Sequence, residues 1–193
     1  MILCTNNKSW LRGLIVPVFF LAFYSACSSG EPLSQNAQIF RKQTLEDFNH
    51  LTSKLVPALN SDSPVIEAGA VLKDFLLDLH GAGRVILGVG MLNTSGSYLT
   101  GYSLEDKATG KLLKNEYKGM KFASFEGVEK IVESGKIVQA PLYFRDTRVL
   151  VIGFPLVKGD NLLGIVYFSF NSDEFVKGWG ISEQEFLRID FSK

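Results

Sequence analysis

Three apolar runs rich in β-branched residues follow one another near the C-terminus, and the links between them are only three or four residues long. The runs cover 136–144, 148–157 and 162–171, with links at 145–147 and 158–161. Links this short can join only antiparallel neighbours, because a parallel connection needs a dozen or more residues. The C-terminal half therefore predicts a three-stranded antiparallel meander, which any fold proposed for the chain must contain.

The residues before this meander predict three helices. Apolar residues recur at helical spacing over 36–56, a helix that Pro57 should end, and again over the segment that starts at Ser63 and Pro64. Gly81 can close this second helix in a left-handed conformation. A shorter helix is expected at 125–134, with Ser124 as its N-cap and Gly135 at its end.

Two further strands and one irregular crossover complete the expected elements. The β-rich segments 85–92 and 98–104 flank a turn at 94–97, so they predict a hairpin. The stretch 105–123 is polar, contains glycine and has little periodicity, which predicts an irregular connection. The tail 172–192 should hold one or two short helical turns. The chain contains no internal repeat.

The first segment of the chain has the order of a secretory signal. Lys8 and Arg12 precede an uncharged apolar run, 13–26, that is shorter than the roughly 20 residues needed to cross a bilayer. The segment Tyr24-Ser25-Ala26-Cys27 resembles the lipobox of bacterial lipoproteins, in which the cysteine thiol is acylated and the chain is cut just before it. An uncleaved signal anchor is the alternative.

Cysteine usage favours the lipoprotein interpretation. Cys4 lies inside the signal, so cleavage would leave Cys27 as the only thiol, and the folded body would have no disulfide. Two or three acyl chains, at about 0.8 kcal/mol per buried CH₂, would anchor the chain stably. Ser28, not Asp, follows the cysteine, which by resemblance to enterobacterial lipoproteins favours the outer membrane.

These features predict three parts and a location. A lipoprotein signal peptide covers 1–26, a lipid-anchored tether covers 27–35, and a single folded domain covers 36–193. The domain should face the periplasm or the exterior, held to the lipid bilayer through acylated Cys27.

Charge and motif content exclude several classes of function. The chain has 20 basic and 20 acidic residues, and removing the two basic residues of the signal leaves 18 against 20, or about −2. The sequence has no basic stripe, so nucleic acid is not an expected partner. The folded body has His50 and His80 but no cysteine, so no zinc cluster and no other metal site is predicted. Gly88-Val89-Gly90 lacks the next glycine of a dinucleotide fingerprint, and no cofactor is expected. The sequence therefore predicts a protein that is not an enzyme, with an active site in 105–123 as a remaining alternative.

The order of elements resembles the Cache domains, extracytoplasmic relatives of the PAS fold. The resemblance covers roughly 38–175 and is carried by Val89-Gly90-Met91-Leu92-Asn93 running into the turn at Gly96, by Gly135-Lys136-Ile137-Val138, and by Phe154-Pro155-Leu156 followed by Leu163-Gly164-Ile165-Val166. It implies an α+β fold in which a five-stranded antiparallel sheet carries N-terminal helices packed on one face. It also implies that a small ligand binds on the other face.

Polar aromatic residues suggest where such a ligand could bind. Tyrosine combines an apolar ring with a hydroxyl, which suits small-molecule pockets. Residues four apart on a strand share a face, so Tyr98 should lie beside Tyr102, and Gln139 beside Tyr143. By the same resemblance, the pocket would lie between this face and the crossover. The predicted ligand-binding residues are Tyr98, Tyr102, Tyr117, Gln139, Tyr143, Arg145 and Tyr167, with Arg145 able to clamp a carboxylate through its planar fork. Ordinary packing with hydroxyls reaching water is the alternative for each residue.

The leading hypothesis from the sequence is a membrane-anchored, non-catalytic module that binds a small molecule and presents the bound state to a membrane sensor or transporter. The alternative is a scaffold lipoprotein that docks an envelope or membrane protein through its long helix or its sheet.

Overall fold

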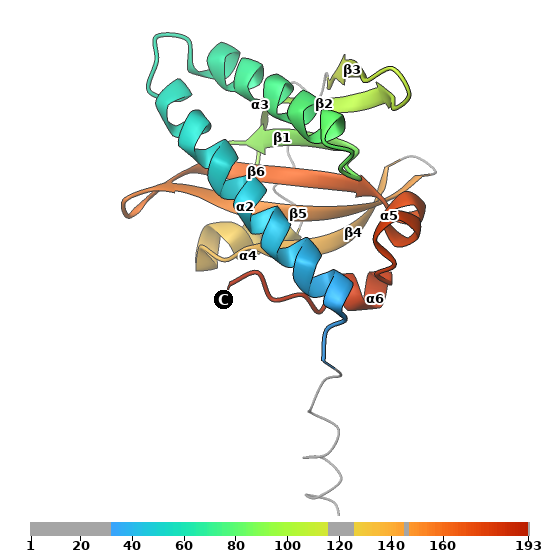
Figure 1. Ribbon diagram of the computed structural model, residues 1–193. Helices are drawn as coiled ribbons and strands as arrows, with labels where there is room; N and C mark the ends of the chain where they lie inside the picture. Colours follow the sequence, from blue (N-terminus) through green and yellow to red (C-terminus); the bar gives the residue numbers. More distant parts are fainter. Residues whose placement is uncertain (1–31, 116–125, 145–146, 193) are drawn as a thin grey trace, which may run out of the picture. The chain divides into compact units, whose positions relative to one another are not determined.

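The computed structural model describes residues 32–115, 126–144 and 147–192. Residues Leu33–Lys193 form one compact unit, drawn in Figure 1. Its helices are α2 (Gln35–Ala58), α3 (Pro64–Gly81), α4 (Glu126–Ser134), α5 (Ser172–Trp179) and α6 (Glu183–Phe186). Its strands are β1 (Gly88–Leu92), β2 (Tyr98–Asp106), β3 (Lys111–Lys114), β4 (Val138–Phe144), β5 (Thr147–Lys158) and β6 (Asn161–Asn171).

The strands form one antiparallel sheet in the order β3-β2-β1-β6-β5-β4. The first hairpin, β1 and β2, therefore joins the C-terminal meander through the pairing of β1 with β6. The α+β class and the three-stranded meander are confirmed. The sheet has six strands, however, where the sequence predicted five.

The additional strand, β3, lies within the stretch that the sequence predicted to be irregular. The Asp106 carboxylate accepts hydrogen bonds from the Ala108 N–H and the Thr109 hydroxyl, both at 2.8 Å. Gly110 then adopts a φ of 67°, which favours glycine, and the chain turns back along β2. With only four residues and a lysine at each end, β3 carries no apolar alternation, so periodicity could not reveal it.

Helices α2 and α3 cover one face of the sheet, here called the α2 face. The Ser34 hydroxyl caps α2 by accepting the Ala37 N–H at 3.2 Å, and Pro57 lies in the last turn. Helix α3 starts at Pro64 after Ser63, as predicted. The expectation for Gly81 is wrong, because α3 continues through it and the left-handed residue is Gly83, with a φ of 71°.

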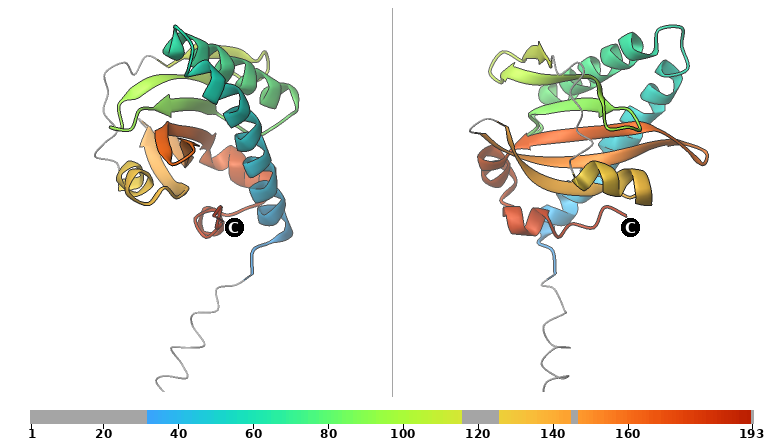
Figure 2. Two further views of the ribbon diagram at one scale, coloured as in Figure 1. Left: turned by 90° about the vertical axis from the view of Figure 1, so that its left-hand side faces the viewer. Right: turned by 180° about the vertical axis from the view of Figure 1, so that it is seen from behind.

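Helix α4 lies on the opposite face, here called the α4 face, as the two views in Figure 2 show. It ends at Ser134, as predicted, and Gly135 follows it with a φ of 62°; the predicted first residue, 125, lies outside the described residues. Ser124, its predicted N-cap, lies outside the described residues. A Cβ at Gly153 of β5 would come within 2.5 Å of Ile131 Cδ1, so α4 packs directly on the backbone of that strand.

The main core lies between the sheet and helices α2 and α3, and it contains many aromatic rings. Phe40, which is 2% exposed, is the central ring. Its ring centroid is 4.9 Å from that of Phe175, 5.0 Å from Trp179 and 5.6 Å from Phe170. Phe186 and Phe191 lie near the same ring, so the C-terminal segment packs against the start of α2.

Residues 1–31 lie outside the described residues, and with them the predicted signal peptide, Cys27 and most of the predicted tether. Within the described ranges, none of the helices has the length and apolar character needed to span a bilayer.

Candidate functional site

The structure describes five of the seven residues predicted to bind a ligand. Tyr98, Tyr102, Gln139, Tyr143 and Tyr167 lie within the described ranges. Tyr117 and Arg145 lie outside them, so their roles stay predictions.

A β-bulge in β2 separates Tyr98 from Tyr102. Leu92 pairs with Tyr98 and Met91 pairs with Thr100, so Leu99 is an extra residue in β2. An extra residue reverses the alternation of side chains beyond it. Tyr98 accordingly packs in the cluster on the α4 face, whereas Tyr102 packs against the core on the α2 face. The prediction that they share a face is wrong.

Gln139 and Tyr143 share a face, as predicted, but it is the α2 face. Gln139 pairs with Ile152 of the main core, and its Nε2 donates hydrogen bonds to the carbonyl oxygens of Ile189 at 2.5 Å and Leu187 at 3.2 Å. Gln139 thus holds the C-terminal segment in place. Tyr143 is 71% exposed, and its hydroxyl accepts a hydrogen bond from Arg148 Nη1 at 3.1 Å. Neither residue lies with Tyr98 or Tyr167.

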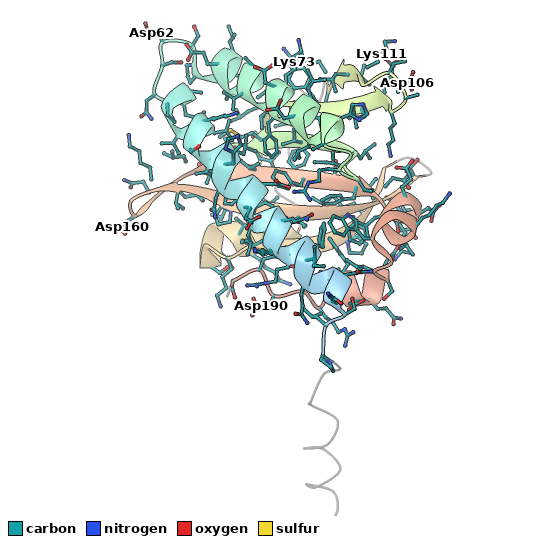
Figure 3. The ribbon with its side chains drawn as sticks, viewed as in Figure 1. Asp62, Lys73, Asp106, Lys111, Asp160 and Asp190 are labelled. Atoms are coloured by element: carbon teal, nitrogen blue, oxygen red, sulfur yellow. The ribbon has the colours of Figure 1, made fainter. Side chains whose placement is uncertain are left out.

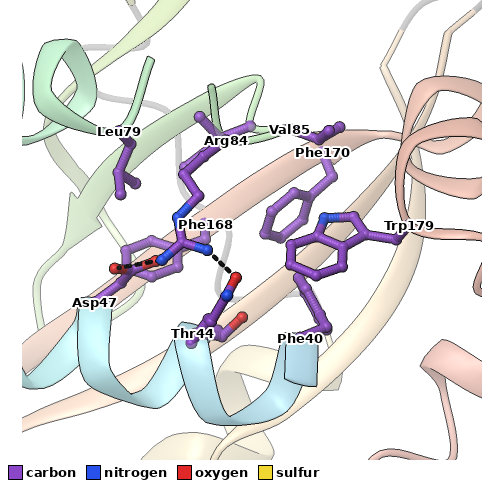
Figure 4. Close-up of a pocket in the computed structure, with 11 residues that line it drawn as sticks. Phe40, Thr44, Asp47, Leu79, Arg84, Val85, Phe168, Phe170 and Trp179 are labelled. Carbon is purple, nitrogen blue, oxygen red and sulfur yellow. Dashed lines mark hydrogen bonds and ion pairs between the residues drawn. The ribbon is translucent and has the colours of Figure 1, made fainter. Parts of the chain in front are cut away.

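A small cavity on the α2 face, drawn in Figure 4, has no room for an organic ligand. This cavity lies between α2, the segment that joins α3 to β1, β6 and α5, and its volume of about 20 Å³ holds about one water molecule. Arg84 closes it by hydrogen-bonding Gln43 and lying 3.6 Å from the Asp47 carboxylate. Burial raises the pKa of Asp47, and the nearby Arg84 opposes that rise only in part. Trp179 Nε1 in the lining is buried without a protein partner, which one water molecule would satisfy.

The α4 face is built differently, because glycines occupy adjacent positions at its centre. Gly90 of β1 pairs with Gly101 of β2 on one side and with Tyr167 of β6 on the other. A Cβ at Gly90 would lie 2.3 Å from the Tyr167 hydroxyl oxygen, so the tyrosine ring extends over β1. A Cβ at Gly101 would lie 2.7 Å from Gly90 Cα and 3.1 Å from the Tyr98 hydroxyl oxygen. The two predicted tyrosines therefore approach one pair of glycines.

Small polar residues continue this area of buried glycines along the same strands. Gly88 pairs with Ser103 and with Ser169, both half-buried, and the Ser169 hydroxyl donates to the Gly88 carbonyl at 3.1 Å. The area formed by these five residues is called the glycine–serine floor; they are Gly88, Gly90, Gly101, Ser103 and Ser169. The residues of the floor offer hydroxyls and backbone groups, and none is charged, which suits neutral polar and apolar atoms of a ligand.

Asn115, the last described residue before 126, forms the rim of the floor. The Tyr98 hydroxyl donates to the Asn115 backbone carbonyl at 2.9 Å, and the Ser103 hydroxyl donates to the Asn115 side-chain oxygen at 2.9 Å. The Asn115 N–H in turn donates to the Gly101 carbonyl at 3.0 Å. Sequence reasoning missed the floor and Asn115, although the glycines at 88, 90 and 101, in strand-like runs, were a visible signal.

Helix α4 covers the remainder of this face with apolar contacts. Its residues Val128 and Ile131 pack with Leu92, Tyr98 and Ile165 in a cluster that Val138 and Tyr167 join. Tyr98 is only 6% exposed, so it mainly packs, whereas Tyr167 is half-buried at the boundary between this cluster and the floor. Among the residues that the structure describes, no group of three His, Cys, Asp or Glu side chains could hold a metal ion.

Comparison with known proteins gives likenesses in structure alone. No protein-family model and no curated protein sequence matches the chain. The ligand-binding domain of the Campylobacter jejuni chemoreceptor Tlp3, in complex with 4-methylisoleucine, matches with a TM-score of 0.53 and 14% identity over 74% of this chain. Methyl-accepting chemotaxis protein X matches with a TM-score of 0.51 and 13% identity over 84% of this chain. An extracellular ligand-binding receptor from Desulfohalobium retbaense matches with a TM-score of 0.50 and 14% identity over 74% of this chain.

The chain spans 55%, 66% and 25% of these three structures, respectively. The identities are low, so the likeness concerns the fold. The chain therefore has the Cache-like fold of extracellular sensory domains, as the sequence resemblance predicted.

Proposed function

We propose that this chain is a lipid-anchored, extracytoplasmic sensory module that binds a small molecule without changing it chemically. The observation that carries the proposal is the glycine–serine floor on the α4 face. In a fold shared with ligand-binding domains, the α2 face is packed with aromatic rings, and the opposite face has a patch of backbone and small side chains. A patch of this kind can form one wall of a small-molecule pocket whose other walls come from the rest of the chain.

The proposed anchoring rests on the N-terminal sequence. The signal-like segment, the residues that resemble a lipobox and the single remaining thiol of Cys27 support acylation there. Ser28 favours the outer membrane by resemblance. In this arrangement the domain faces the periplasm or the exterior, and a membrane sensor or transporter is the partner that would read its state.

The proposed site combines the floor with Tyr98 and Tyr167, and with Tyr117 and Arg145 as predicted contributors. The Tlp3 domain that shares the fold was solved with 4-methylisoleucine and with L-norvaline. Both are small molecules with an apolar side chain, which is the part that the uncharged floor would suit. A carboxylate of the ligand would pair with Arg145. We therefore propose a small organic acid or amino acid as the ligand class.

A thermal-shift screen with matched tyrosine variants tests this proposal. The panel comprises organic acids, amino acids and amines, because a ligand that binds only the folded state raises the melting temperature with its concentration. We expect at least one compound to stabilise the wild type and Tyr143→Phe equally but to stabilise Tyr167→Phe less. Tyr143 is the matched control, since it loses the same hydroxyl from the α2 face.

A panel that shifts none of the three proteins, together with side chains filling the space over the floor in a crystal structure, would defeat the proposal. A compound that stabilises Tyr167→Phe and the wild type equally would place its site elsewhere.

A scaffold function is the second candidate, and the exposed apolar residues of α3 favour it. Ile66 is 75% exposed, Val65 43% and Leu77 38%. Helix α2, which the structure describes completely, exposes one large apolar side chain, Ile39. Docking would therefore involve α3 more readily than α2. Cross-linking in membranes that recovers only the monomer would count against this function.

A further inference from the structure

A surface hollow lies where α2 begins and the C-terminal segment ends. It is lined in part by Leu33, Ile39, Arg41, Lys42, Arg188 and Asp190, and is called the basal hollow. Figure 1 shows the start of α2 beside the segment that follows α6, and Figure 3 labels Asp190 at this end of the domain. With a volume of about 720 Å³, the hollow is large enough for a phospholipid headgroup.

Two hydrogen bonds hold the walls of the basal hollow together. The Ser34 N–H donates to Oε1 of Glu185 in α6 at 2.6 Å. Arg41 Nε donates to the Asp190 carbonyl oxygen at 2.5 Å. The hollow is therefore a built feature of the domain, in which the two ends of the described chain are fixed to each other.

Positive charge predominates in the lining. Within the lining, Arg41, Lys42 and Arg188 contribute three cations against the one carboxylate of Asp190, while Glu46 and Glu185 lie next to Lys42 and Arg188 outside the lining. The Lys42 side chain is 76% exposed, and its ammonium lies 3.9 Å from Glu46, an exposed pair that leaves the lysine available. Arginine and lysine side chains are the usual partners of phosphate groups.

Exposed apolar side chains lie beside these cations. Ile39 of α2, which lines the hollow, is 41% exposed. Leu187, which follows α6 and precedes Arg188, is also 41% exposed. Cations next to apolar side chains are typical of surfaces that sit at the boundary between headgroups and acyl chains.

The hollow lies close along the chain to Cys27, the proposed site of acylation, which favours the membrane surface as its partner. Leu33, in its lining, is six residues after Cys27, a distance that a fully extended chain covers in about 20 Å. If Cys27 is acylated, as the proposed function has it, the hollow cannot move farther than that from the headgroups. A tether this short makes even weak binding to the membrane effective. We propose that the basal hollow docks the domain on an anionic phospholipid surface and so restrains its orientation at the membrane.

Hydrogen exchange on the acylated full-length product in nanodiscs tests this inference. Discs of phosphatidylcholine alone are compared with discs that also contain phosphatidylglycerol. We expect the anionic discs to slow exchange in peptides covering 33–42 and 187–192. Since one basic residue near an anionic surface changes binding by about fivefold, Lys42→Gln with Arg188→Gln should reduce the affinity by on the order of 25-fold and abolish the protection. Lys73→Gln, on the exposed side of α3, is the matched control and should retain it.

Several outcomes separate docking from anchoring. Chains that stay on both kinds of disc with equal exchange would overturn the docking inference and leave the anchor intact. If the full-length product isolated from cells carries no acyl group but is protected on anionic vesicles, the result would support docking and defeat the anchor. Inorganic phosphate that reproduces the protection on phosphatidylcholine discs would also overturn the inference, because it would indicate a site for a free anion. Equal loss of protection in Lys73→Gln would do the same.

Discussion

Replacing Gly90 by alanine tests the arrangement on which the proposed site depends. The new Cβ would lie 2.3 Å from the Tyr167 hydroxyl oxygen, 2.4 Å from Cζ and 2.7 Å from Cε1. Ordinary contact between such atoms requires about 3.5 Å. The ring must therefore move by about 1 Å or more, and overpacking of this kind costs about 1–3 kcal/mol of stability.

The Tyr167→Ala background removes the obstacle, so the cost of the Gly90→Ala change should depend on Tyr167. In wild type we expect a loss of about 2 kcal/mol, whereas in the Tyr167→Ala background the same change should cost less than about 0.5 kcal/mol. The coupling energy of the double-mutant cycle would then be about 1.5 kcal/mol, well above the roughly 0.5 kcal/mol expected of independent sites.

Urea unfolding of the four proteins of the cycle gives these free energies, followed by far-ultraviolet circular dichroism and by Trp179 fluorescence. Gly81→Ala is the control, because nothing lies within 4 Å of the Cβ it would add and alanine favours a helix. It should be neutral or stabilising. Additive costs of Gly90→Ala and Tyr167→Ala would refute the reasoning, since the ring could not then lie over β1.

Three further predictions concern the packing and the titration of the domain. Phe40→Ala should cost about 3–5 kcal/mol in urea unfolding, because the ring is 2% exposed among five other aromatic rings, whereas Ile39→Ala, at a 41% exposed site, should cost less than about 1 kcal/mol. Burial raises the pKa of Asp47 above its ordinary 3.8, so the native state holds this proton more tightly than the unfolded chain. Stability should therefore fall as the pH rises from 3.8 through the native pKa, and the urea midpoint of Asp47→Asn should depend less on pH in that range. The Ser34 N–H holds the pKa of Glu185 below its ordinary 4.5, so Glu185→Ala should speed hydrogen exchange in the first turn of α2 at neutral pH and leave global unfolding within about 0.5 kcal/mol of wild type. Wild type should show the same loss of protection, measured against the intrinsic exchange rate at each pH, only at a pH below the native pKa of Glu185.

The sequence predicted the elements whose signals are local. Helical spacing, Pro64 at the start of α3 and Gly135 at the end of α4 each act within a few residues, and the structure agrees with them. The links between β4, β5 and β6 left no choice but antiparallel pairing. The family resemblance implied that the hairpin and the meander share one sheet, but the pairing of β1 with β6 was not predicted, because no local pattern specifies which distant strands pair.

Predictions about sheet faces failed where one residue changed the register. Leu99 is an ordinary strand residue in the sequence, yet as the extra residue of a bulge it moves Tyr102 to the α2 face. Gln139 was assigned to a ligand because its environment could not be known. Its partners are carbonyl groups about fifty residues away, in a segment with no strand signal. The register of paired strands and the hydrogen bonds of Gln139 depend on tertiary contacts, which cannot be predicted from the local pattern of a single sequence.

The glycines of the α4 face do not by themselves indicate a binding site, since each has a steric reason to be glycine. A Cβ at Gly88 would lie 2.7 Å from the Tyr102 carbonyl oxygen, and one at Gly101 would lie 2.7 Å from Gly90 Cα, so both residues permit the close approach of β1 and β2. Gly90 makes room for the Tyr167 ring in the same way. The serine hydroxyls have partners within the protein, since Ser103 donates to Asn115 and Ser169 donates to the Gly88 carbonyl. A face that needed only to be filled would still gain more from apolar residues than from half-buried serines beside a half-buried tyrosine. Loss of stability in Gly101→Ala would therefore report on the backbone of the sheet, whereas altered ligand binding in Tyr167→Phe with unchanged stability would report on function. A floor that serves only packing would change stability in both variants and ligand binding in neither.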